Sequence, residues 1–146
     1  IVVYFIFSNN ISQNDASNFN ELYNDAIILS ETLLSAGSPV TWNLSNVEEA
    51  GITNGDYRLN ISKLGNLSSI DYSLSKNYLK TRFDYLVFFE DRIGEVIDFG
   101  GMKYIGKNSV TKDNIKSLED PSTLISIKRF LIYGTNIVTM VIYVWE

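Results

Sequence analysis

The stretch IVVYFIFSNNISQNDASNFNELYNDAIILSETLLSA, residues 1–36, carries the strongest pattern in this sequence. Its first seven residues are all apolar, and a mostly polar segment follows from residue 8 to residue 18. From residue 19 the apolar positions recur mostly at steps of three and four, which predicts an amphipathic helix over 19–36. Asn18 and Glu21 are spaced as a capping box at its start, and Gly37 followed by Pro39 indicates its end.

The apolar run of residues 1–7 admits two interpretations. Val, Tyr, Phe and Ile favour strands, so the run fits a buried first strand. Alternatively it continues the helix, and one helix over 1–36 would be about 54 Å long at about 1.5 Å per residue. The rest of the chain would form a body with a radius of gyration of about 13 Å, so the apolar tip of such a helix would project. Exposing seven such side chains forfeits about 10 kcal/mol, so a projecting tip needs a partner.

Composition indicates one folded domain with a sizeable core. The chain has 146 residues, of which 45% are hydrophobic and 13% aromatic. Its net charge of −5 disfavours nucleic acid as a partner. Residues 1–57 contain no Lys or Arg, which indicates either a solvated acidic face or a charge asymmetry that steers copies of the chain together.

The residues that usually perform catalysis are scarce. With no His, a Ser nucleophile lacks its commonest base, and 73–76 has only the bare spacing of a Ser-x-x-Lys site. Glu90 with Asp91 and Glu48 with Glu49 are adjacent carboxylates, but neighbours in a strand point to opposite faces. No Cys, phosphate-binding glycine loop, zinc spacing or calcium loop is found in the sequence. We therefore expect no enzyme activity, no metal and no cofactor.

The rest of the chain predicts a second helix and an antiparallel sheet. Ile70, Leu74 and Tyr78 are spaced by four, which favours a helix over about 68–81, while 57–64 alternates loosely, as a strand does. Apolar runs predict strands over about 84–90, 95–99, 102–105, 124–133 and 137–145. The last two strands form a hairpin, and the loop 107–120 is locally basic.

Four Asn-x-Ser sequences are acceptors for N-glycosylation if the chain is exported. They begin at Asn10, Asn43, Asn60 and Asn66.

A set of spaced residues resembles a recurring pattern of archaeal type IV pilin-like proteins. In that pattern a helix ends at Gly-x-Pro-x-x-Trp, and a Gly-Ile/Leu-Thr turn and an Arg-Leu-Asn-x-x-Lys-Leu segment follow. The matching residues here are Leu33-Leu34-Ser35-Ala36-Gly37-Ser38-Pro39-Val40-Thr41-Trp42, Val47, Gly51-Ile52-Thr53, Arg58-Leu59-Asn60 and Lys63-Leu64. Later matches are Phe83-Asp84-Tyr85, Lys128-Arg129-Phe130, Tyr133-Gly134 and the final Trp145.

The resemblance implies a helix that projects from a small β-rich head. Its apolar half would lie in the membrane before assembly and in the filament core afterwards. Residues 1–18 would then be the apolar stalk end with a polar crossing, and residues 19–146 a single globular head. The peptidase motif of that family does not occur among these residues, which indicates either a truncated chain or a relative that does not polymerise.

We therefore expect an α+β fold in which a long N-terminal helix, with an apolar tip and an amphipathic second half, packs on an antiparallel sheet. The expected function is that of a structural subunit of an extracellular type IV pilus-like filament, a homopolymer used for adhesion. The expected assembly residues are Ile1, Val2, Val3, Tyr4, Phe5, Ile6 and Phe7. The alternative is a minor pilin or membrane-anchored surface domain that binds a ligand singly, through the basic 103–116 loop or exposed aromatic residues.

Overall fold

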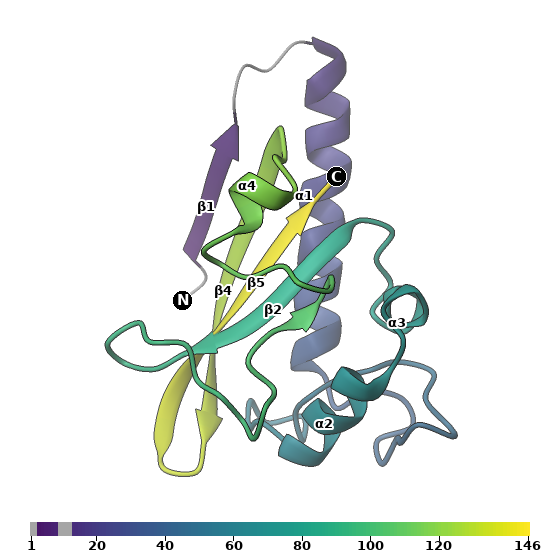
Figure 1. Ribbon diagram of the computed structural model, residues 1–146. Helices are drawn as coiled ribbons and strands as arrows, with labels where there is room; N and C mark the ends of the chain where they lie inside the picture. Colours follow the sequence, from purple (N-terminus) through teal and green to yellow (C-terminus); the bar gives the residue numbers. More distant parts are fainter. Residues whose placement is uncertain (1–2, 9–12) are drawn as a thin grey trace.

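A five-stranded antiparallel sheet forms the centre of the molecule (Figure 1). The computed structural model describes residues 3–8 and 13–146, with side chains from residue 16 onward. The strand order is β1-β4-β5-β2-β3. The strands are β1 Val3–Ser8, β2 Asp84–Glu90, β3 Ile105–Gly106, β4 Thr123–Tyr133 and β5 Asn136–Trp145. The helices are α1 Gln13–Leu34, α2 Ile61–Ser69, α3 Tyr72–Tyr78 and α4 Ile115–Leu118.

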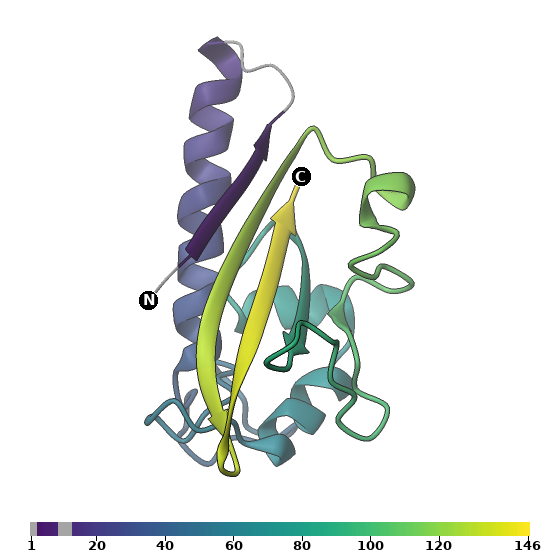
Figure 2. The ribbon, with the colours of Figure 1, turned by 90° about the vertical axis from the view of Figure 1, so that its left-hand side faces the viewer.

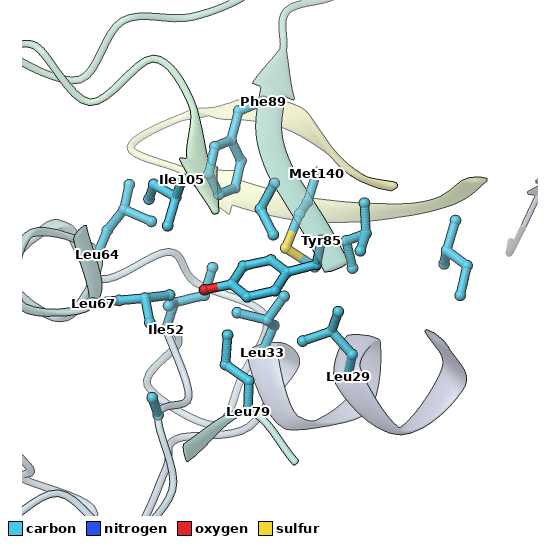
Figure 3. Packing of buried hydrophobic residues seen from close by; sticks show 14 of the residues in the cluster. Leu29, Leu33, Ile52, Leu64, Leu67, Leu79, Tyr85, Phe89, Ile105 and Met140 are labelled. Atoms are coloured by element: carbon cyan, nitrogen blue, oxygen red, sulfur yellow. The ribbon is translucent and has the colours of Figure 1, made fainter. Parts of the chain in front are cut away.

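The main core lies between the sheet and the three longest helices. α1 runs along one face of the sheet and contacts β4 and β5 (Figure 2). Tyr85 of β2 lies in the middle of this core, with Leu33 of α1 and Met140 of β5 close to it (Figure 3). Side chains alternate along each strand, so the opposite face of the sheet is a separate surface. There a smaller apolar cluster is covered by α4 and its flanking loop, and it contains Leu86, Phe88, Val110, Ile115, Leu124, Val141 and Trp145.

The prediction of a long N-terminal helix that includes the apolar run is wrong. Residues 3–8 form β1, which pairs with β4 so that Val3 lies opposite Lys128 and Ser8 opposite Thr123. The eleven-residue β4 has a second edge that β5 does not cover, and the apolar, β-favouring residues of the run supply a partner for its backbone groups. For residues 3–7 the two interpretations are therefore decided in favour of the strand.

The helix that follows is also shorter and more polar than a stalk requires. α1 begins at Gln13, so Asn18 lies inside it rather than at its cap, and the expected boundary between stalk and head at residue 18 falls within α1. None of the helices in the described part of the chain is long and apolar enough to cross a membrane.

Other elements differ from the expected ones in length or position. In the expected strand 95–99 only Val96 makes a bridge, to Glu90, and the expected strand 102–105 is reduced to the two-residue β3. The expected helix 68–81 is split by Asp71, which caps α3 by accepting from the backbone N–H groups of Ser73 and Leu74. α2 occupies part of the segment that alternates as a strand does.

Candidate functional site

The residues of the resemblance that lie between positions 33 and 64 gather around the C-terminal end of α1. The last carbonyls of a helix have no partner within it and must find one elsewhere. The Ile52 N–H donates to the Leu33 carbonyl at 2.9 Å. Thr53 adds three bonds. Its hydroxyl donates to the Leu34 carbonyl at 2.6 Å and to the Ser35 carbonyl at 3.1 Å, and its N–H donates to the Ser35 carbonyl at 3.2 Å. The Gly-Ile-Thr segment therefore caps α1.

A buried tryptophan and two glycines pack closely beside this end of α1. Trp42 is 3% exposed, and its Nε1 donates to the Gly51 carbonyl at 2.8 Å. A Cβ on Gly51 would lie 2.2 Å from the Ser35 oxygen. Gly37 has a φ of +80°, and a Cβ there would lie 2.5 Å from the Trp42 ring. Both positions are thus restricted to glycine by the close approach of neighbouring atoms.

Lys63 ties α2 to the same junction. Asn60 caps α2 by accepting from the Lys63 backbone N–H at 3.1 Å. The Lys63 side chain is buried, and its Nζ donates to the Ala36 carbonyl at 2.7 Å and to the Thr53 carbonyl at 2.9 Å. Burial lowers the pKa of Lys63. A positive charge at this position also complements the negative end of the α1 dipole. We call this set, Gly37, Trp42, Gly51, Thr53, Asn60 and Lys63, the α1 junction.

A second polar cluster joins β2 to α3 and to the 107–120 loop. Asp84 accepts hydrogen bonds from Lys76 at 2.6 Å, from the Tyr72 hydroxyl at 2.7 Å and from Lys107 at 2.7 Å. Burial alone would raise the pKa of Asp84, but these hydrogen bonds outweigh it and lower the pKa to about 2. Lys107 also pairs with Glu119. The cluster borders a charged hollow of about 530 Å³ beside the start of β2.

The Ser-x-x-Lys spacing at 73–76 forms no nucleophile–base pair in the structure. The Lys76 Nζ instead pairs with the Asp84 carboxylate at 2.6 Å. Ser75 instead donates to the Tyr72 carbonyl and shares a 2.5 Å hydrogen bond with the Tyr85 hydroxyl. Burial raises the pKa of Tyr85 to about 12, with the Ser75 hydrogen bond opposing the shift.

The adjacent carboxylates are likewise engaged in structural contacts. Glu90 pairs with Lys112 and Lys128, whereas the Asp91 carboxylate accepts from backbone N–H groups of the turn that follows. Glu48 and Glu49 lie on the loop after α1, and each accepts a hydrogen bond from a serine hydroxyl. Glu49 also pairs with Lys80. Within the described ranges no group of three or more carboxylates is arranged to hold a metal ion. Two lysines of the basic loop are also engaged in ion pairs, Lys107 with Asp84 and Lys112 with Glu90.

An exposed apolar surface lies near the turn between β4 and β5, which is at the end of the molecule opposite the start of α1 (Figure 1). Ile93 is 82% exposed, Ile137 60% and Phe130 46%. Two hollows of about 500 and 570 Å³ flank Ile137, and both include Asp91 and Arg92. We call these three apolar residues the tip surface. The sequence does not indicate this surface, because Ile93 stands alone in a polar turn.

The expected site residues are placed as follows. Ile1, Val2 and Asn10 lie outside the described residues, and Val3 to Phe7 belong to β1 rather than to a helix. Asn43 is exposed on the loop after α1. Asn60 and Asn66 are half-buried, the first at the cap of α2 and the second inside it.

Comparison with protein-family models, with curated proteins and with solved structures finds no match to this chain. The resemblance to archaeal type IV pilin-like proteins therefore rests on the spaced residues, most of which are now located at or near the α1 junction.

Proposed function

We propose that this chain is a structural subunit of an extracellular, cell-surface filament with a role in adhesion. The observation that carries the proposal is the α1 junction. Its spaced residues do not converge on a cavity with free polar groups, as those of an enzyme do. They cap one helix, and the neighbouring segment connects it to the sheet, since the Leu59 N–H donates to the Ile132 carbonyl of β4 at 2.9 Å and the Ile132 N–H donates to the Tyr57 carbonyl at 2.8 Å. A subunit that must keep its shape under load needs such a connection.

The proposal assigns the contacts between copies to the tip surface. Exposed apolar side chains gathered in one place are typical of interaction sites. Ile93 and Ile137 line one hollow, and Phe130 and Ile137 line the other. Contacts between unlike surfaces of identical subunits produce rings or open filaments. Because Val3 to Phe7 are paired in the sheet, this proposal does not use an apolar helix as the centre of the filament.

The test is electron microscopy of the protein as its host makes it, purified from the cell surface, with surface labelling to establish where it resides. Filaments are expected. The double variant Ile93→Ser/Ile137→Ser should abolish them, whereas Val40→Ser/Leu118→Ser, which changes two similarly exposed residues elsewhere, should not. A wild-type protein that stays monomeric at high concentration, or a tip variant that still polymerises, would contradict the proposal.

The alternative is a surface domain that binds a ligand as a single molecule. The observation that favours it is the pair of hollows beside Ile137, whose volumes are within the range of small-ligand pockets. A surface-located monomer that adheres to its target, and loses adhesion in the Ile93→Ser/Ile137→Ser variant, would favour this alternative over the filament.

A further inference from the structure

The three N-glycosylation sequences in the described part of the chain differ in how their amides are engaged. Glycosylation joins the Asn Nδ2 to a sugar, and its recognition also requires the hydroxyl two residues later. A folded protein is therefore a substrate only where the amide nitrogen and that hydroxyl are exposed together. Asn43, Asn60 and Asn66 can be compared on this basis.

Asn43 satisfies both requirements. It is exposed, as are Leu44 and Ser45. Its Oδ1 accepts from the Ser45 N–H at 2.9 Å and from the Ser45 hydroxyl at 2.6 Å, so the amide and the hydroxyl are adjacent. Asn46 holds the turn by accepting from the Asn43 N–H at 2.7 Å. Among the described residues no hydrogen bond engages the Asn43 Nδ2, which leaves this nitrogen available.

Asn60 is committed to the α1 junction. Its Oδ1 accepts from the Lys63 N–H at 3.1 Å, and its Nδ2 donates to the Asn54 Oδ1 at 2.8 Å. The residue is half-buried. A sugar on this nitrogen would occupy the space between the cap of α2 and the turn that contains Asn54, so the folded junction opposes modification.

Asn66 is restricted by the helix that contains it. It lies within α2 and is half-buried, and the Ser68 hydroxyl donates to the Gly65 carbonyl at 2.8 Å. Residues two positions apart in a helix do not face each other, so Asn66 and Ser68 come together only if α2 unwinds. Unwinding would expose Leu64 and Leu67, which are buried in the main core.

We propose that Asn43 is the residue that receives a glycan, and that the fold protects Asn60 and Asn66. The donor is a sugar linked through phosphate to a lipid, used by an oligosaccharyltransferase. The Nδ2 forms a bond to C1 of the sugar, the bond from C1 to the phosphate oxygen breaks, and its electron pair stays on that oxygen. The Nδ2 loses one proton to a base of the enzyme. The proposal rests on the surface location proposed above, because such donors are used on exported proteins.

The experiment presents the folded protein to an oligosaccharyltransferase and lipid-linked donor chosen because the pair modifies an isolated peptide containing Asn43. Peptides with Asn60 and Asn66 are the unfolded controls. Peptide mapping by mass spectrometry is expected to show modification of the folded protein at Asn43 at least tenfold faster than at the other two positions. The isolated peptides should differ far less. Asn43→Gln and Ser45→Ala should each abolish the modification at this position.

Two results would overturn the inference. One is a folded protein in which Asn43 stays bare although its peptide is modified. The other is modification of Asn60 or Asn66 at a rate comparable to that of Asn43. Mapping of protein taken from the host surface separates this inference from the proposed function, since a surface filament with bare Asn43 overturns only the former. A glycan on Asn43 in a surface protein that never assembles contradicts only the filament.

Discussion

At Gly51 two loop backbones lie so close together that no side chain fits between them. A Cβ would lie 2.2 Å from the Ser35 oxygen and 2.3 Å from the Gly37 nitrogen. These are backbone atoms on the cap of α1, so they cannot swing away as the end of a flexible side chain does. Gly51 is therefore the residue on which the geometry of the α1 junction depends most directly.

We predict that Gly51→Ala destabilises the protein by about 3 kcal/mol, the upper range for overpacking of a rigid site. Gly65→Ala is the matched control. Gly65 lies inside α2, and its Cβ would meet only the Met102 sulfur at 3.8 Å. Ala is favoured over Gly in a helix interior, so this variant should gain about 0.5–1 kcal/mol. Urea unfolding measures both, and similar free energies of unfolding for the two variants would refute the packing described at Gly51.

Asp84 is expected to make stability depend on pH in the acid range. Its pKa is about 2 in the folded protein and 3.8 in the absence of partners, so the folded state binds the proton less readily. The resulting stabilisation, about 2 kcal/mol, is fully present above the unfolded pKa and is lost as the pH falls through the folded pKa. Asp84→Asn should therefore lose several kcal/mol at pH 7, because Lys76 and Lys107 lose their shared acceptor.

The measurement is the free energy of unfolding of wild type and Asp84→Asn between pH 5 and pH 2. The difference between the two proteins should shrink by about 2 kcal/mol as the pH falls from about 4 to about 2. A difference that stays constant over this range would show that the carboxylate does not have the depressed pKa that its three partners imply.

Among the elements, β1 differs most from the expected fold, because it replaces the apolar half of the expected helix with an edge strand. Its register places Phe5 opposite Ser126 of β4. The chain has no cysteine, so an introduced pair is the only possible disulfide within it. We predict that Phe5→Cys/Ser126→Cys forms an intramolecular disulfide on mild oxidation, because paired residues on antiparallel strands lie within bridging distance.

Phe5→Cys/Lys128→Cys is the control for that prediction, since it is displaced by two residues in the same register. Non-reducing peptide mapping should find the bridge in the first variant and much less of it in the second. If neither variant forms the bridge, the pairing of β1 with β4 is contradicted.

Elements with strong local patterns were predictable, and elements that depend on partners were not. The expected strands 84–90, 124–133 and 137–145 correspond closely to β2, β4 and β5, since their dense apolar runs leave few alternatives to a buried strand. The two-residue β3 exists only through its pairing with β2. The capping pattern at Asn18 was misleading, because Glu21 pairs with Arg82 on the surface of α1 instead of closing a helix start.

The candidate site was predictable only in part. The spaced residues from Gly37 to Lys63 were visible as a pattern, but the sequence does not show that Lys63 reaches back to the carbonyl of Ala36, 27 residues earlier. The tip surface was not foreseen, because its members come from β4, β5 and the turn after β2, which only the folded sheet brings together.

At the scale of the whole molecule, ion pairs within the fold partly compensate the charge asymmetry of the sequence. Several acidic residues before position 58 pair with basic residues that follow in the chain, among them Glu31 with Arg129 and Glu49 with Lys80. These pairs connect α1 and its following loop to β4 and to the end of α3. The acidic N-terminal half is therefore part of how the chain folds, and these pairs reduce the separation of charge that could steer copies together.

The central claim is that the α1 junction and the sheet form one cooperative unit. Amide hydrogen exchange tests it most directly at Ile52 and Thr53, whose N–H groups are bonded to the carbonyls of Leu33 and Ser35. We predict that these two amides exchange as slowly as those in the centre of β5, through global unfolding alone. Exchange orders of magnitude faster than β5, at the rate of an exposed loop, would show that the junction opens independently of the sheet and would contradict the account.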